Sequence, residues 1–222
     1  MSSIFKDDEL VKAIEKVKVE SPERRFRESI DLTIVFRGLD LKRDTSKRLS
    51  DKLELPHRFN PPKKICVIGS SGFAYKAKEA GADRIITPEE LKELSKNKRL
   101  LKKLAKEYDH FVAQADLMPT IARILGPILG PRGKMPTPVP VAATNLNDIV
   151  EKMRKSVTLR MRNLPVLHVK VGSRDMDTKK IVENIKAIFD YLDRKYGGLR
   201  KYFDRAYLKT TMGPPVTIGE HE

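Results

Sequence analysis

Large apolar residues occupy every second position of the segment SIDLTIVF, residues 29–36. This two-residue period predicts a β-strand with one buried face. The same period returns in residues 158–162 and 167–171, and residues 163–165 between them, which include Pro165, can turn. The C-terminal pattern therefore predicts an antiparallel hairpin, and a last strand is expected over residues 207–211.

A different pattern fills residues 63–156, where short apolar runs alternate with helical segments. The run KKICVIGSSG predicts a buried strand and a glycine turn before a helix over residues 73–80, and ADRIIT and DHFVAQAD predict two more strands. Between those two strands, residues 88–108 have a helical period throughout, with Pro88 suited to the first turn. Helices over LMPTIARILG and residues 147–155 follow. Strands that alternate with helices are typical of a parallel sheet with right-handed crossovers.

The segment LGPILGPRGKMPTPVP, residues 125–140, holds the densest cluster of glycine and proline. Glycine permits unusual backbone dihedrals, and proline limits backbone entropy. We therefore predict a rigid surface loop here, with Arg132 and Lys134 as ordinary loop bases.

The two flanks of the middle segment are each too small to bury a core. Residues 1–62 offer one helix and one clear strand, whereas residues 157–222 offer three strands and a helix with an apolar stripe. Joined, they would make one domain, and closely spaced termini allow such an insertion. We therefore predict an α/β fold of two domains: a discontinuous α+β domain of residues 1–62 plus 157–222, with an antiparallel sheet, and an inserted, doubly wound Rossmann-like domain of residues 63–156.

Lysine and arginine number 45 against 30 acidic residues, which gives the 222-residue chain a net charge of +15 and a pI near 9.8. The bases are interleaved with acidic and apolar residues, so the charge belongs to folded surface rather than to a tail. This balance predicts a polyanionic partner. The densest basic run is either a solvated helix face or a phosphate contact. Its bases are Lys96, Lys98, Arg99, Lys102, Lys103 and Lys106.

Composition argues against several other classes of protein. No apolar run approaches the roughly 18 residues of a membrane span, and the N-terminus MSSIFKDDEL lacks the apolar stretch of a signal peptide. We expect a cytoplasmic protein with no membrane partner. The single cysteine, Cys66, lies in a predicted buried strand and excludes an intramolecular disulfide framework. Because the histidines lack the spacing of a metal site or a catalytic triad, we expect no enzyme activity, no cofactor and no metal.

One turn keeps a nucleotide-binding alternative open. Gly69, Ser70, Ser71 and Gly72 follow a strand and precede a helix, where backbone amides can bind phosphate. Their spacing matches neither the dinucleotide nor the Walker motif, and Asp83 precedes the second strand rather than ending it. An ordinary turn is the main expectation. An enzyme or nucleotide-binding protein that uses the parallel sheet is the alternative.

The predicted hairpin gathers basic residues on one face. His168 and Lys170 share the polar face of their strand, and a hairpin would bring Arg160 and Arg162 to the same face on the neighbouring strand. Three permanent cations and a titratable imidazole suit the backbone of RNA. A face that is simply solvated is the alternative.

The segment KTTMGPPV follows the last predicted strand. Thr210 and Thr211 would donate to phosphate or 2′-hydroxyl oxygens, and Gly213 would let RNA approach the backbone closely. A strand end with a turn is the alternative. Just before the first strand, Phe26 lies beside Arg25 and would stack on a base or a sugar.

Four segments of the chain together resemble one family. They are FRESIDLTI (26–34), LPH (55–57), LGPILGPRGKMPTP (125–138) and TTMGPPV (210–216). Their order across almost the whole chain is similar to the large-subunit ribosomal protein of the mobile stalk, the L-one family, and the compact length is more similar to archaeal members. Arg58 departs from the pattern, because many relatives have glycine after LPH.

The resemblance implies a discontinuous RNA-binding domain made from both termini, an inserted Rossmann-like domain and no enzyme activity. The implied partners are the large-subunit rRNA of the mobile stalk, tRNA in the exit site and other parts of the large ribosomal subunit. The resemblance also implies assistance in the release of deacylated tRNA. Translational repression through the protein's own mRNA leader is implied as well.

The resemblance assigns RNA contacts to three segments. The positions that match the family motif are Phe26, Glu28, Ser29, His168, Lys170, Thr211, Met212 and Gly213. Arg25, Arg160, Arg162 and Thr210 are added from charge, sheet face and hydroxyl chemistry rather than from the motif. The glycine and proline segment lies in the inserted domain, so we do not include it in the principal RNA site.

Overall fold

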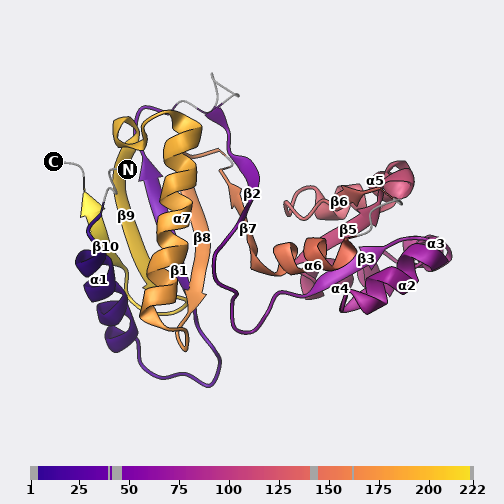
Figure 1. The fold of residues 1–222 in the computed structure, drawn as a ribbon. Coiled ribbons are helices and arrows are strands. Elements are labelled where there is room, and N and C mark those ends of the chain that lie inside the picture. Colours follow the sequence, from indigo (N-terminus) through magenta and orange to yellow (C-terminus); the bar gives the residue numbers. More distant parts are fainter. Residues whose placement is uncertain (1–4, 40, 42–46, 141–144, 162, 221–222) are drawn as a thin grey trace. The chain divides into compact units, whose positions relative to one another are not determined.

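The computed structural model describes residues 5–39, 41, 47–140, 145–161 and 163–220, and the chain divides into two compact units (Figure 1). Unit 1 combines the ranges 1–60 and 156–222, and unit 2 is the range 61–155. The first and last parts of the sequence therefore belong to one body, and the middle part forms another.

Unit 1 is built on an antiparallel sheet with the strand order β10–β9–β1–β8. Its strands are β1 (Ser29–Phe36), β8 (Val166–Ser173), β9 (Phe203–Thr210) and β10 (Val216–Glu220). The N-terminal strand β1 lies between two C-terminal strands, with Leu32 opposite both Leu208 and Val169. The sheet is therefore complete only when both ends of the chain have met.

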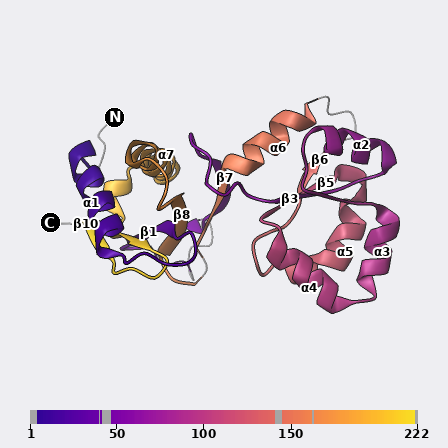
Figure 2. The same ribbon diagram turned by 90° about the horizontal axis from the view of Figure 1, so that it is seen from below.

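Two helices, α1 (Asp7–Glu20) and α7 (Thr178–Tyr196), lie on the same side of this sheet (Figure 2). The alternating apolar residues of β1 are all buried beneath them, as the two-residue period predicted. The apolar stripe of α7 is buried as well. That helix ends where Gly197 takes the left-handed conformation (φ 62°), which residues with a Cβ adopt at a cost.

The predicted C-terminal hairpin is wrong. Strand β7 (Ser156–Arg160) pairs antiparallel with β2 (Ser50–Glu54) in a separate two-stranded ladder, whereas β8 pairs with β1. The alternation marks both segments as strands but says nothing about their partners, and each partner lies more than a hundred residues away. The sequence also did not reveal β10, which returns along β9 after the KTTMGPPV segment.

Unit 2 has a parallel sheet with the strand order β4–β3–β5–β6. Its strands are β3 (Ile65–Ile68), β4 (Arg84–Ile86), β5 (His110–Gln114) and β6 (Thr137–Val139). Helices α2 (Ser71–Glu79) and α6 (Leu146–Lys155) pack on one face, around Phe73 and Val150. Helices α3 (Pro88–Ser95), α4 (Lys98–Glu107) and α5 (Met118–Leu129) pack on the other, around Leu101 and Leu125. The predicted fold class, with one antiparallel and one parallel sheet, is confirmed.

Two local predictions in unit 2 were wrong. Residues 88–108 form two helices rather than one, because the Asn97 side chain accepts a hydrogen bond from the Arg99 amide and starts α4 afresh. The glycine and proline segment is not a loop throughout. Its first residues continue α5 through Pro127 to Leu129, since burial of Leu125 and Leu129 in the core outweighs the cost of proline in a helix.

Within the described ranges, no helix has both the length and the apolar character needed to cross a bilayer.

Candidate nucleic-acid interface

The sheet of unit 1 has a second face, turned away from α1 and α7, that is rich in cations. We call it the outer face. Its side chains are Asp31, Thr33, His168, Lys170, Arg205, Tyr207 and Lys209. The strand register places Asp31 opposite both Lys170 and Lys209, and Thr33 opposite both His168 and Tyr207. Strands β8 and β9 thus bring Lys170, Lys209 and His168 close to the carboxylate of Asp31 on β1, whereas Arg205 is paired with Asp204.

Several contacts hold the outer face in order. The Lys170 ammonium lies 5.1 Å from the centre of the Phe59 ring, a cation–π contact. His168 Nδ1 and the Thr33 hydroxyl are 3.1 Å apart, within hydrogen-bonding distance. Burial raises the pKa of Asp31, although the charges of Lys170 and Lys209 act in the opposite direction. The basic side chains around Asp31 therefore do not fully offset the cost of burying its carboxylate.

Two segments from opposite ends of the chain meet at one edge of the outer face. We call residues 26–29 and 211–213 the rim. The Thr211 amide donates to the Ser29 carbonyl at 3.1 Å, and the Ser29 amide donates to the Thr211 hydroxyl at 3.1 Å. Beside these bonds, Phe26 and Met212 are 52% and 60% exposed, unusual values for large apolar side chains. The rim therefore offers hydroxyl, backbone and apolar groups together.

A chain of buried hydrogen bonds fixes the rim from beneath. The Gly213 amide donates to the Thr210 hydroxyl at 2.9 Å, which donates to Ser21 Oγ at 2.9 Å, which in turn donates to Glu28 Oε2 at 2.8 Å. The other oxygen of Glu28 accepts the Met212 amide at 3.1 Å. The backbone of 212–213 is thus tied to residues that precede β1.

Gly213 is required by this packing. A Cβ at this position would lie 2.3 Å from the Thr210 hydroxyl oxygen and 3.2 Å from Ser21. Any other residue would push apart the groups that carry the buried hydrogen bonds. The glycine therefore permits close approach within the protein, and its predicted role in close approach of RNA stays a prediction.

Arg174, in the turn between β8 and α7, joins the network to the end of α1. Its guanidinium donates to the carbonyl oxygens of Ser21 at 2.7 Å, Pro22 at 2.9 Å and Lys18 at 3.2 Å, and lies 3.4 Å from Glu28 Oε2. Burial alone would raise the pKa of Glu28. The hydrogen bonds from Ser21 and the Met212 amide and the charge of Arg174 outweigh it, so the pKa of Glu28 lies below its ordinary value.

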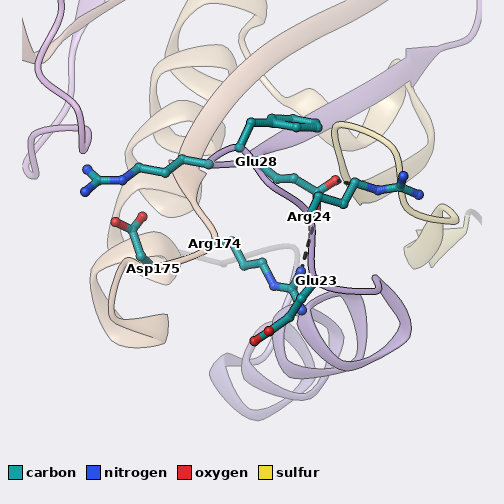
Figure 3. Close-up of a pocket in the computed structure, with 7 residues that line it drawn as sticks. Glu23, Arg24, Glu28, Arg174 and Asp175 are labelled. Carbon is teal, nitrogen blue, oxygen red and sulfur yellow. Dashed lines mark hydrogen bonds and ion pairs between the residues drawn. The ribbon is translucent and has the colours of Figure 1, made fainter.

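A hollow of about 420 Å³ opens above this network (Figure 3). Its lining residues are Glu23, Arg24, Phe26, Arg27, Glu28, Arg174 and Asp175. One wall is held by Asn60, which accepts from Arg27 at 3.1 Å and donates to Asp175 at 2.7 Å. Three arginines and three acidic residues line the hollow, so their charges balance, and the exposed ring of Phe26 offers an apolar surface on which a base or a sugar could stack.

The structure places three of the residues predicted from sequence away from the exposed groups of this site. Thr210 and Glu28 are buried, with 0% and 1% exposure, so they position the rim instead of facing a ligand. Arg160 ends β7 opposite Ser50, in a different sheet from His168, because the hairpin that would have joined them does not form. Arg162 lies outside the described residues. Phe26, Ser29, Thr211, Met212 and Gly213 are in the rim, Arg25 directly precedes it, and His168 and Lys170 are on the outer face.

Sequence reasoning did not find Arg174, Ser21 or the β9 residues of the outer face. The alternation of Arg205, Tyr207 and Lys209 with buried residues was a usable signal for β9. Arg174 and Ser21 carry no local pattern, because their partners are far away in the sequence.

The glycine turn of unit 2 is occupied by contacts within the protein. The amide and hydroxyl of Ser70 both donate to Gln114 Oε1, at 3.0 and 2.9 Å, and the Gly69 amide donates to the Ile86 carbonyl at 3.2 Å. These bonds use the amides of Gly69 and Ser70, two of the groups in the turn that could otherwise bind a phosphate. Among the described residues there is also no group of three histidine, cysteine or acidic side chains able to hold a metal ion.

Comparison with known proteins matches one family over most of the chain. The model of the "Ribosomal protein L1p/L10e family" matches residues 12–214. The large ribosomal subunit protein uL1 of Korarchaeum cryptofilum is 49% identical over 216 residues, covering 96% of this chain and 95% of that protein. The proteins of the same name from Methanothermobacter thermautotrophicus and Archaeoglobus fulgidus are 43% and 42% identical, covering 95% and 97% of this chain and 98% and 99% of those proteins.

Proposed function

The chain belongs to the ribosomal protein L1p/L10e family, a family of structural and non-enzymatic components of the large ribosomal subunit, and we propose that unit 1 is the domain with which it grips large-subunit rRNA. The single observation that carries this proposal is the meeting of the rim and the outer face on one surface. In this proposal unit 2 is the inserted, Rossmann-like domain.

The outer face supplies the charge that an RNA backbone needs. Lys170 and Lys209 are permanent cations that lie opposite Asp31 on the two strands beside β1, and His168 adds a titratable group. Arg205 lies four residues before Lys209 on β9 and is paired with Asp204 at 3.0 Å. Contacts of lysine and arginine with phosphate release counterions, so they supply affinity and make binding sensitive to salt. The outer face therefore accounts for strength of binding more than for choice of RNA.

The rim supplies groups that distinguish folded RNA from other polyanions. The hydroxyls of Ser29 and Thr211 can exchange hydrogen bonds with 2′-hydroxyl groups, and Phe26 and Met212 offer apolar surface to a base or a ribose. We assign direct contacts to Arg25, Phe26, Ser29, Thr211, Met212, His168 and Lys170, and to the backbone of Gly213. Glu28 and Thr210 act as positioning residues that hold the rim in place.

Two finer activities follow from the same surface. We propose that the protein binds the rRNA of the mobile stalk near the tRNA exit site and assists the release of deacylated tRNA from it. We also propose that the rim and outer face bind a similarly folded leader of the protein's own mRNA, which would repress its translation. The full-length similarity to archaeal ribosomal proteins supports both, because it covers both units.

The test is to identify the RNA that the protein carries. The full chain is purified at moderate salt, the bound RNA is treated with nuclease, and the protected fragment is sequenced. We expect one fragment of large-subunit rRNA from the wild-type protein and a much lower yield from the Phe26→Ala/Met212→Ala variant. A random collection of RNA fragments, equal in both proteins, would contradict the proposal. The rival nucleotide-binding function predicts saturable binding of ATP or NAD, which we expect to be absent in a titration.

A further inference from the structure

Helix α4 of unit 2 presents a band of basic residues to solvent. The band consists of Lys96, which directly follows α3, and of five bases of α4: Lys98, Arg99, Lys102, Lys103 and Lys106. All six are exposed. The sequence left open whether this run is a solvated face or a phosphate contact. Its arrangement in the structure distinguishes the two readings.

The helical period gathers the five bases of α4 on one side. At 100° per residue, they fall within an arc of about 140°, and Leu101, Leu104 and Ala105 point the opposite way into the core. From Lys98 to Lys106 the band is about 12 Å long at 1.5 Å per residue. That length is several times the axial spacing of phosphates along one strand, which is about 3.4 Å in duplex DNA, so the band can span several consecutive phosphates.

The charges of α4 oppose the stability of the helix. Lys98 and Arg99 stand in the first turn, where the positive end of the helix dipole favours acidic residues, and that turn contains no acid. Five pairs of these bases are three or four residues apart, a spacing at which like charges repel. In the described part of the chain, no acidic side chain forms an ion pair with any of them. A partner with negative charge would relieve all of these costs at once.

The glycine and proline segment adds a seventh base to the band. After α5 the chain returns to α4, where the Arg132 guanidinium donates to the Lys102 carbonyl at 3.4 Å. Lys134 fixes this return by donating to the carbonyls of Ala105 at 3.1 Å and Tyr108 at 2.7 Å, at the end of α4. The fold thus brings Arg132 beside bases about thirty residues earlier in the chain, and increases the repulsion there.

We propose that the exposed face formed by α4 and Arg132 is a second RNA-binding surface, which takes the phosphate backbone of duplex RNA. The length of the band and its uniform charge fit consecutive phosphates. A lipid surface fits less well, because the apolar side of α4 is buried in the core and cannot enter a bilayer. The surface is separate from the rim and the outer face of unit 1, so it adds to the proposed function and does not require it.

The experiment measures binding of a perfectly paired RNA duplex of about 16 base pairs, a length that a duplex-binding domain covers. One variant of the full chain carries Arg99→Gln, Lys102→Gln and Lys103→Gln. The matched control carries Lys76→Gln, Lys78→Gln and Lys92→Gln, which removes the same charge from exposed positions elsewhere in unit 2. Fluorescence anisotropy gives the Kd of each between about 50 and about 200 mM salt.

We expect the α4 variant to bind the duplex at least about tenfold more weakly than the control at the lowest salt. Its plot of log affinity against log salt should be shallower by about three units, so the difference in affinity between the two proteins should shrink steeply as the salt concentration rises. Arg132→Gln alone should lower the slope by about one unit. Equal affinities and slopes for the α4 variant and the control would overturn the proposal.

The difference in duplex affinity between the α4 variant and the control should persist when Lys170→Ala is added to both, because Lys170 belongs to unit 1. A difference that vanishes in this background would place the duplex on unit 1 and overturn the proposal. The rRNA experiment described under Proposed function could fail while the α4 variant still binds the duplex more weakly than the control. That result would overturn only the proposed function. Circular dichroism melting curves of the variants and the control check that the fold is preserved.

Discussion

Glu28 lies at the centre of the rim, and the substitution Glu28→Gln tests whether buried groups position it. The carboxylate is 1% exposed and accepts hydrogen bonds from Ser21 and from the Met212 amide, with Arg174 beside it. A glutamine keeps the shape but replaces one acceptor oxygen by an NH₂ group. If the NH₂ group replaced Oε1, it would face the Met212 amide, which is also a donor. If it replaced Oε2, it would face the donors Ser21 and Arg174.

The expected loss of stability follows from these contacts. A hydrogen bond to a charged group contributes about 1.5 to 3 kcal/mol, and an unpaired buried partner costs a similar amount. Removal of one member of a buried ion pair costs about 3 to 5 kcal/mol, but Arg174 keeps three carbonyl partners and is partly exposed. We therefore expect Glu28→Gln to lower the free energy of unfolding by about 2 to 4 kcal/mol.

The affinity for RNA is a second measurement. The direction in which it changes distinguishes a positioning role of Glu28 from a direct effect of its charge. Removal of a negative charge near a polyanion would by itself strengthen binding. If Glu28 holds the backbone of 212–213, the substitution should instead raise the Kd for rRNA by about tenfold or more. Glu23→Gln is the matched control, because Glu23 is exposed and lines the same hollow, so it should leave stability unchanged and strengthen binding slightly.

The assays are urea unfolding followed by circular dichroism and titration with the protected rRNA fragment. The pKa of Glu28 is lower in the folded protein than in the unfolded chain, so its stabilisation is complete above about pH 4.5 and is lost as the pH falls through the folded value. The stability gap between wild type and Glu28→Gln should thus be constant from about pH 7 to 5 and shrink below that. A gap under about 0.5 kcal/mol at pH 7, or binding as strong as that of Glu23→Gln, would refute the positioning role.

Four other measurements test separate parts of the account. Thr211→Val should change stability by less than about 1 kcal/mol, because its bonds to Ser29 are exposed, but should weaken rRNA binding by about tenfold; unchanged binding would remove Thr211 from the interface. Lys170→Ala should lower the slope of log affinity against log salt by about one unit, and an unchanged slope would show that it contacts no phosphate. Burial raises the pKa of Asp31, so its charged form destabilises the folded state at neutral pH. Asp31→Asn should therefore increase both the resistance of the protein to urea and its affinity for RNA. Weaker RNA binding by this variant would contradict the prediction. Burial raises the pKa of Cys66 to about 12, so iodoacetamide at about pH 8 should label it only after denaturation, as mass spectrometry would detect.

Strand periodicity predicted more of this molecule than any other signal. It located β1, β7 and β8 and the buried side of β1, and the switch to strand–helix alternation after residue 63 predicted the parallel sheet. It could not predict pairing, because alternation is a property of one segment, whereas β7 and β8 find their partners in β2 and β1. The missed β10 has an irregular register with β9, which weakened its pattern.

The same periodicity could have corrected two site residues. Glu28 lies two residues before Ile30, and Thr210 two residues after Leu208, so both are in phase with buried positions of their strands. Their polar character suggested exposure, but their positions in the two-residue alternation of the strands indicated burial. Burial of these groups is tolerated because Ser21, Arg174 and two backbone amides satisfy them. Three of the bonds, Thr210 to Ser21, Arg174 to Glu28 and Met212 to Glu28, join residues more than 140 positions apart, and no local pattern foretells such partners.

The account depends most on the proposal that the rim touches RNA, and site-specific photo-crosslinking measures this directly. A benzoyl-phenylalanine is placed at Met212, which is 60% exposed, or at Tyr75 of unit 2, which is 67% exposed and serves as the matched control. After irradiation of each protein with large-subunit rRNA, the crosslinked nucleotides are mapped by sequencing. We predict one cluster of neighbouring nucleotides from position 212 and few crosslinks from position 75. Scattered or equal crosslinks from the two positions would contradict the account.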